Sequence, residues 1–356
     1  MTAFWINSNR LNYFIILLIF IVVVSSCEEV LTLKVPEHPP MITVNSILDA
    51  GQPIRVYVTS SKPYPPLIDS SLRIKDANVK LYKDGVYIED LFYHKWQQYY
   101  HSWVGNYQSA GNFTPEVNHS YSINVTAPGF SEVYSETKIP QPVHLISVDT
   151  VTVITQYAGH YTSALECKIK FKDPGGIKNY YNLSITRTIK TQDCDFRGIN
   201  CQTKIGIGRV PYICHDLNVI FFIPNFDIPG FISLEKEEDS GYLPDEVFLT
   251  DDTFDGKTYE LIVLIPLNVL GLAILGDYKG TYISRLYLNL YTINDEYFRY
   301  SSSYFKQVSK KADMFSEPCQ VYSNINNGAG IFSGTSVSVD SSILMRVNEP
   351  VIMFKK

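Results

Sequence analysis

The chain has 356 residues and a formal net charge of −6 at pH 7, with 30 Lys and Arg against 36 Asp and Glu. It contains no basic block, which argues against nucleic-acid binding, because that function needs clustered Lys and Arg against phosphate. The length suits two domains or one large β domain, and the 26 Tyr and 19 Phe are typical of extracytoplasmic β proteins.

The N-terminal 26 residues are predicted to be a signal peptide. The basic residue Arg10 precedes an apolar run over residues 13–24, which is shorter than the roughly 20 residues of a membrane-spanning helix. The run ends at Val24-Ser25-Ser26-Cys27. This pattern resembles the bacterial lipobox, in which the cysteine thiol takes a diacylglycerol and becomes the mature N-terminus. We therefore expect a covalent lipid on Cys27 and no other cofactor, with residues 27–39 as a lipid-anchored linker. The alternative is an ordinary cleaved signal with an incidental cysteine.

Short runs with a period of two predict an immunoglobulin-like β-sandwich over residues 40–140. Ile54, Val56 and Val58 alternate with polar or aromatic neighbours. Asp84-Gly85 separates two such runs and predicts a hairpin, because its turn favours positive φ. Pro140-Gln141-Pro142 is the predicted end of this domain, since paired prolines stiffen the chain and end strand pairing.

Residues 141–356 are predicted to form a larger, β-rich, sandwich-like domain with one helix, so the fold class is mainly all-β. The helix is expected near residues 295–311, with Asn294 as its cap, acids in its first turn and lysines in its last. The run Asp251-Asp252-Thr253-Phe254-Asp255-Gly256 is similar to a calcium loop, but Ile262 stands where such a loop needs its final Glu. We expect a hairpin turn there and no metal site.

Aside from Cys27, the chain has five cysteines. Cys167 lies on the apolar side of an alternating run, which predicts a buried thiol on a strand. The other four are disulfide candidates, because an oxidising compartment is expected: Cys194, Cys201, Cys214 and Cys319. A Cys194–Cys201 bridge would close a short polar loop, and Cys214 with Cys319 would follow. A metal site including His215 is less favoured, since no paired C-x-x-C occurs.

Aromatic residues gather shortly after the predicted hairpin, at Trp96, Tyr99, Tyr100, Trp103 and Tyr107. Because the rings of this segment fall at both odd and even positions, a strand pair cannot bury all of them on one face. Exposed rings there would bind a glycan, a peptide or a partner protein. The alternative, which we weigh more heavily, is that these rings serve the core and edges of the sandwich.

Several strings occur in a characteristic order along the chain: PPMITVN from residue 39, YSINVTAPGF from 121, ETKIP from 136, DPGG from 173, FDGK from 254, FSEP from 315, YSNI from 322 and GAGIF from 328. In this order they resemble the Bacteroidota lipoprotein family catalogued as domain of unknown function 4249. The resemblance implies an outer-membrane lipoprotein, often encoded beside a TonB-dependent receptor, without established catalytic residues. The cluster over residues 315–334 is its most specific part, and its glycines indicate turns first and a partner contact second.

Catalytic signatures are missing from the sequence: it has no G-x-S-x-G elbow, no H-E-x-x-H helix and no phosphate-binding glycine loop. We therefore expect a non-enzymatic accessory or substrate-capture partner of a TonB-dependent receptor. It would be anchored in the outer membrane by its lipid and face the cell surface, with the periplasmic face as the alternative. A stand-alone carbohydrate- or peptide-binding module or adhesin is the alternative function, and a secreted hydrolase with a dispersed site is a third.

Overall fold

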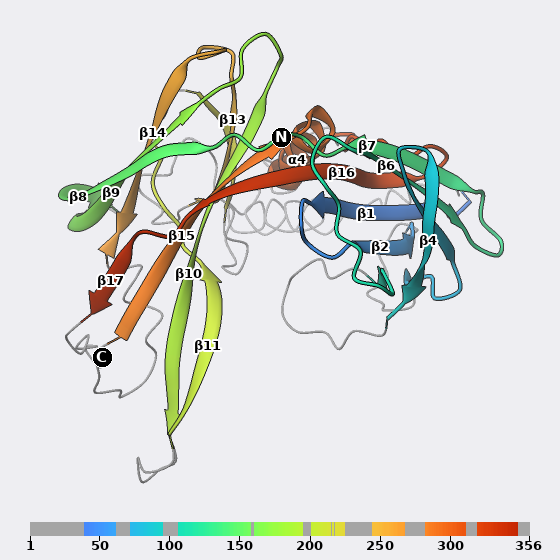
Figure 1. The fold of residues 1–356 in the computed structure, drawn as a ribbon, viewed down its shortest axis with the longest axis horizontal. Helices are drawn as coiled ribbons and strands as arrows, with labels where there is room; N and C mark the ends of the chain where they lie inside the picture. Colours follow the sequence, from blue (N-terminus) through green and yellow to red (C-terminus); the bar gives the residue numbers. More distant parts are fainter. Residues whose placement is uncertain are drawn as a thin grey trace, which may run out of the picture. The chain divides into compact units, whose positions relative to one another are not determined.

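The computed structural model describes residues 39–61, 72–94, 106–157, 160–194, 201–214, 216, 218–224, 244–267, 282–310 and 319–347. These residues are mostly β-strand, with one helix, which confirms the predicted fold class (Figure 1). Within these ranges we find no helix with the length and apolarity needed to cross a bilayer.

Seven strands form the N-terminal sandwich: β1 (Ile42–Asp49), β2 (Arg55–Ser60), β3 (Asn78–Lys83), β4 (Val86–Tyr93), β5 (Tyr107–Gln108), β6 (Ser120–Thr126) and β7 (Val133–Lys138). Alternate residues of β1, β3 and β6 point into one apolar core, as the period of two predicts. The predicted hairpin is confirmed, because β3 pairs with β4 and both Asp84 (φ 49°) and Gly85 (φ 77°) are left-handed.

The rest of the chain contributes β8 (Leu145–Tyr157), β9 (His160–Lys172), β10 (Tyr180–Cys194), β11 (Cys201–Arg209), β12 (Val219–Pro224), β13 (Pro244–Thr250), β14 (Thr258–Pro266), β15 (Tyr282–Ile293), α4 (Asp295–Lys310), β16 (Ala329–Asp340) and β17 (Leu344–Val347). Strands β14, β9 and β8 form a three-stranded sheet. Its inner side chains, such as Phe171 and Val263, share a second core with Tyr181 of β10 and Leu288 of β15. The second region is therefore a sandwich of two sheets.

A parallel pairing joins the two regions into one sheet. Strand β16 lies beside β1, in register from Thr43 opposite Ala329 to Asp49 opposite Thr335 (Figure 1). Phe332 of β16 is fully buried in the N-terminal core. The predicted boundary at residue 140 therefore does not divide the fold, since the N-terminal sandwich is completed by a strand from near the C-terminus. A period of two along a strand does not reveal which distant strand will pair with it.

The glycines of the C-terminal cluster allow this close pairing. A Cβ on Gly330, whose φ is 107°, would lie 2.0 Å from the carbonyl oxygen of Val44. A Cβ on Gly328 would lie 2.6 Å from the carbonyl oxygen of Ile42. Gly330 belongs to strand β16, so the expectation that it serves a turn is wrong at this position. Close backbone contact with β1 explains the glycine instead.

Helix α4 confirms the predicted helix to within one residue at its C-terminal end. Its rings Tyr297, Phe298 and Phe305 pack against a small apolar cluster around Phe248 of β13. Asn294 precedes the helix, and its backbone carbonyl oxygen accepts the Phe298 N–H (3.1 Å), but its side chain does not have the predicted capping role, because Oδ1 accepts from the Ser333 hydroxyl (2.6 Å). The side-chain Nδ2 donates to Thr137 Oγ1 (2.8 Å) and to the Lys138 carbonyl oxygen (3.0 Å). It thereby ties the start of the helix to β7.

Candidate functional site

Two turns at one end of the second sandwich bring acidic side chains together. Residues 173–179 carry the chain from β9 to β10, and residues 251–257 carry it from β13 to β14. Each turn passes from one sheet to the other, because β14 pairs with β9 whereas β13 pairs with β10 and β12. The predicted hairpin at residues 251–256 is therefore wrong. The local turn residues are the same for a hairpin and for a crossover, and only the strand partners distinguish the two.

We call Asp173, Asp251, Asp252 and Asp255, together with Lys178, the acidic corner. One carboxylate oxygen from each of Asp173, Asp251 and Asp255 lies within 4.8 Å of the others. Asp173 and Asp251 are buried, whereas Asp255 is exposed. Oxygen ligands of this kind suit a hard cation such as Ca²⁺. Among the described residues, these are the side chains that could hold a metal ion.

The carboxylates of the corner already bind the protein itself. Asp173 accepts hydrogen bonds from the Tyr181 hydroxyl and from the Gly256 N–H (2.8 Å), and Asp255 accepts one from the Gly176 N–H (2.9 Å). Each turn thus supplies an aspartate that binds the backbone of the other turn. A Cβ on Gly175 would lie 3.0 Å from the Gly256 Cα, so the two backbones are in contact. The arrangement locks the turns together.

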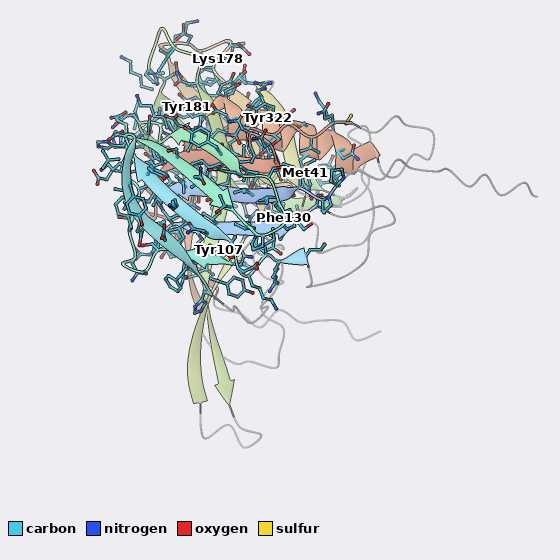
Figure 2. The ribbon with its side chains drawn as sticks, turned by 90° about the vertical axis from the view of Figure 1, so that its right-hand side faces the viewer. Met41, Tyr107, Phe130, Lys178, Tyr181 and Tyr322 are labelled. Atoms are coloured by element: carbon cyan, nitrogen blue, oxygen red, sulfur yellow. The ribbon has the colours of Figure 1, made fainter. Side chains whose placement is uncertain are left out.

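Lys178 compensates much of the remaining charge. Its Nζ lies 3.0 Å from Asp251 Oδ1 and also pairs with Asp252 (Lys178 and Tyr181 are labelled in Figure 2). This ion pair lowers the pKa of Asp252 below its ordinary value. Asp251 Oδ2 accepts a further hydrogen bond from the Asn179 N–H at 2.7 Å. The corner is therefore explained as a structural lock between the sheets.

A cluster of polar side chains lies next to Phe254. The ring of Phe254 stacks on Tyr259 with centroids 4.0 Å apart, and the Tyr259 hydroxyl donates to Asp216 and accepts from Asn218 Nδ2 (2.7 Å). Burial raises the pKa of the Tyr259 hydroxyl. Nearby, burial raises the pKa of the Cys214 thiol to about 11, so the thiol is protonated at neutral pH and a weak nucleophile.

The expectation of an exposed contact at Tyr107 is wrong. Its ring is buried and packs edge-on against Tyr93, with centroids 5.6 Å apart. Its hydroxyl donates to the Ile74 carbonyl oxygen (2.9 Å) and accepts from the Ala77 N–H (3.0 Å), so this polar tip is satisfied inside the sandwich. The other predicted contacts lie outside the described residues, as does the predicted lipidation site: Trp96, Tyr99, Tyr100, Trp103 and Cys27.

The two predicted cysteine pairs have different outcomes in the structure. Cys167 is a buried free thiol, as predicted, and burial raises its pKa to about 12. Cys214 and Cys319 are also free, so the predicted bridge between them is not formed: Cys214 lies beside Ile262 of β14, whereas Cys319 is held near α4. Cys194 and Cys201, by contrast, lie directly opposite each other in the β10–β11 pair.

Sequence reasoning did not find the acidic corner, because the members of its two turns lie more than 70 residues apart in the chain. The sequence signal that could have indicated the acidic corner is that both turns combine an aspartate with glycine. Two such turns at the ends of neighbouring strands can bind each other's backbone.

Comparison with known proteins gives one match. A family model described as "Domain of unknown function (DUF4249)" matches residues 28–341. The match begins at the residue after Cys27 and covers both cores. No curated protein and no solved structure matches the chain.

Proposed function

Because the chain belongs to the DUF4249 family, we propose that it is a non-enzymatic outer-membrane lipoprotein that works as an accessory or substrate-capture partner of a TonB-dependent receptor. One observation carries this proposal: the family match starts at Glu28, directly after the lipobox-like cysteine. Acylation of Cys27 would attach the whole family domain to the membrane through the residue directly before it. A cell-surface orientation is part of the proposal, with the periplasmic face as its alternative.

The mechanism is positional. A lipid anchor confines the two sandwiches to a thin layer at the membrane, which raises their effective concentration near a membrane partner. A contact of modest intrinsic affinity is then sufficient for function. Two or more acyl chains are needed for this, since a single chain gives only marginal, reversible binding.

The chemistry of the described residues supports a role without catalysis. The thiols of Cys167 and Cys214 have raised pKa values, and the carboxylates of the acidic corner are bound to backbone N–H groups and to Lys178. A general base or nucleophile needs a free, suitably ionised group within reach of substrate. These side chains instead hold the structure together.

A second candidate is a stand-alone glycan- or peptide-binding module or adhesin. Strands β4 and β5 pair at Tyr93 and Tyr107, and the His94 N–H donates to the Asn106 carbonyl oxygen at 2.8 Å. Residues 95–105, with Trp96 and Trp103, therefore connect two paired strands, a position that often carries binding residues. This candidate predicts saturable binding by the purified protein alone, lost in Trp96→Ala or Trp103→Ala variants that remain folded.

An extracytoplasmic location also leads us to propose a disulfide between Cys194 and Cys201. Their backbones are opposed in register across β10 and β11. An oxidising compartment would let such a pair form and persist.

The proposed function is tested by affinity purification of the tagged chain from native membranes. We expect an outer-membrane barrel protein to co-purify and the Cys27→Ala variant to leave the membrane fraction. Metabolic labelling with palmitate should mark the unmodified chain but not the variant. Recovery of the lipidated chain without any barrel partner would contradict the receptor role, and a chain that stays unlabelled would contradict the anchor itself.

A further inference from the structure

Strand β8 is an edge strand without the usual protection. It ends the sheet order β14-β9-β8, and no described strand pairs with its outer side. A free row of N–H and C=O groups is a template for a further strand, and natural proteins commonly block it with charges or proline. β8 has no proline, and its single charged residue, Asp149, faces Lys168 of β9. Within the part of the chain that the structure describes, this edge is therefore available to pair with a further strand.

The tip of the β8–β9 hairpin extends beyond its sheet. Strand β14 pairs with β9 only from Ala164 onward, so residues 154–157 and 160–163 form a two-stranded ribbon among the described strands. On this ribbon 76% of Ile154 and 83% of Tyr161 are exposed. Their face is the one that, further along β9, carries the buried Cys167. Two-stranded ribbons are at best marginally stable in water, so this tip would gain stability from another strand.

A lipid surface is a poor occupant for this ribbon, because open strand edges leave backbone groups unsatisfied in hydrocarbon. A second copy of the strand fits better. Residues 150–157 carry no charge, although the whole chain is acidic, with a net charge of −6. Two copies of this chain repel each other least where such neutral strands meet, and the backbone groups of one strand satisfy those of the other.

We propose that β8 pairs antiparallel with β8 of a second copy of the chain, which joins the two three-stranded sheets into one of six strands. A two-fold axis through Val153 opposes residues 149–157 of both copies. Asp149 then faces position 157 of the other copy, and Val151 faces Thr155, so no like charges are opposed. Such an interface is isologous, with the same patch on both partners.

The test is sedimentation equilibrium of the full chain in mild detergent over a concentration series. We expect a reversible monomer–dimer equilibrium, with association at least about tenfold weaker in Val153→Lys and in Val153→Glu, because each places like charges beside the axis. An equal mixture of the two variants should recover the lost affinity, since opposite charges then meet. Ser163→Lys, on β9 and one strand away from the edge, is the matched control and should associate like the unmodified chain.

The proposal is overturned if the unmodified chain stays monomeric throughout the series. It is also overturned if Val153→Lys associates normally or if the mixture of variants recovers nothing. Circular dichroism checks that each variant is folded. Should the Val153 variants fail to fold, the double variant Val151→Lys with Thr155→Lys replaces them, because these positions face each other across the axis and should also prevent association.

Discussion

Arg209 Nη1 lies 2.6 Å from Glu246 Oε1, and this ion pair bridges two strands that share one edge of β10. β13 pairs with β10 up to Glu246 opposite Ser184, and β11 continues the same edge from Arg209 opposite Thr186. The charges thus meet where one partner strand of β10 ends and the next begins.

Replacement of Arg209 by Ala should lower the free energy of unfolding by about 1–2 kcal/mol, because the mostly buried Glu246 carboxylate then loses its ion-pair partner. Urea unfolding measures the change. Lys170→Ala is the matched control, since the Lys170–Glu260 pair (3.2 Å) is well exposed on both sides and should contribute about 0.5 kcal/mol or less. Equal costs for the two variants would contradict a bridging role for Arg209.

Gly330→Ala should destabilise the protein by at least about 3 kcal/mol, because the new Cβ would collide with the Val44 carbonyl oxygen and the positive φ disfavours alanine. Hydrogen exchange should show lost protection in β1 and β16 together. Gly129→Ala serves as control: its φ is also positive, at 80°, but a Cβ there meets nothing within 4 Å. We expect roughly 1 kcal/mol for it. A similar cost at both glycines would show that β1 and β16 are not in close contact.

Burial raises the pKa of Asp49 from its ordinary 3.8 to about 6, with an opposing hydrogen bond from Thr335. The folded protein therefore holds this proton more tightly than the unfolded chain, so the stability contributed by Asp49 is lost as pH rises between about 4 and 6. Because the side chain keeps partial access to water, we expect a loss of roughly 1 kcal/mol. Asp49→Asn should remove this slope and be the more stable protein at pH 7, as urea unfolding at several pH values would show.

Asp84 serves as the comparison, because its pKa is shifted in the opposite direction from that of Asp49 and its contribution to stability should therefore depend on pH with the opposite sign. A hydrogen bond from His119 and one from the Ser120 N–H lower the pKa of this exposed carboxylate. Its contribution is present above the unfolded pKa and lost as pH falls. Asp84→Asn should therefore be less stable than the unmodified chain at neutral pH, and this difference should disappear toward acid pH. If both variants showed the same pH dependence, burial of Asp49 would not be the cause of its slope.

A Cys194–Cys201 disulfide should be visible directly by mass spectrometry. Trypsin cleaves after Arg197, between the two cysteines, so a bridged chain yields peptides 191–197 and 198–204 as one linked species that dithiothreitol separates. Closing so short a loop stabilises a chain by at most about 2–3 kcal/mol. Buried Cys167 should stay unalkylated until the protein is unfolded, and serves as the control for native structure. Free, alkylatable thiols at residues 194 and 201 in protein from the native envelope would contradict the bridge.

The features that depend on neighbours along the chain could be predicted from the amino-acid sequence alone. The alternation in β1 and β3, the Asp84-Gly85 turn and the start of α4 at Asp295 all follow from residues within a few positions of each other. The buried Cys167 belongs to the same group. Side-chain period and turn conformation are local properties, and they can be predicted without knowing any distant partner.

Which distant segments lie side by side could not be predicted from the sequence and is known from the three-dimensional fold. Thr335 and Asp49 are 286 positions apart yet lie opposite each other in the parallel β1–β16 pair. That pairing gives the N-terminal sandwich its last strand. The burial of Tyr107 and the crossover at residues 251–257 likewise depend on strand partners that are distant in the sequence. Strand pairing is set by which hydrophobic faces and hydrogen-bonding edges complement each other in three dimensions, and a single strand's pattern is compatible with many partners.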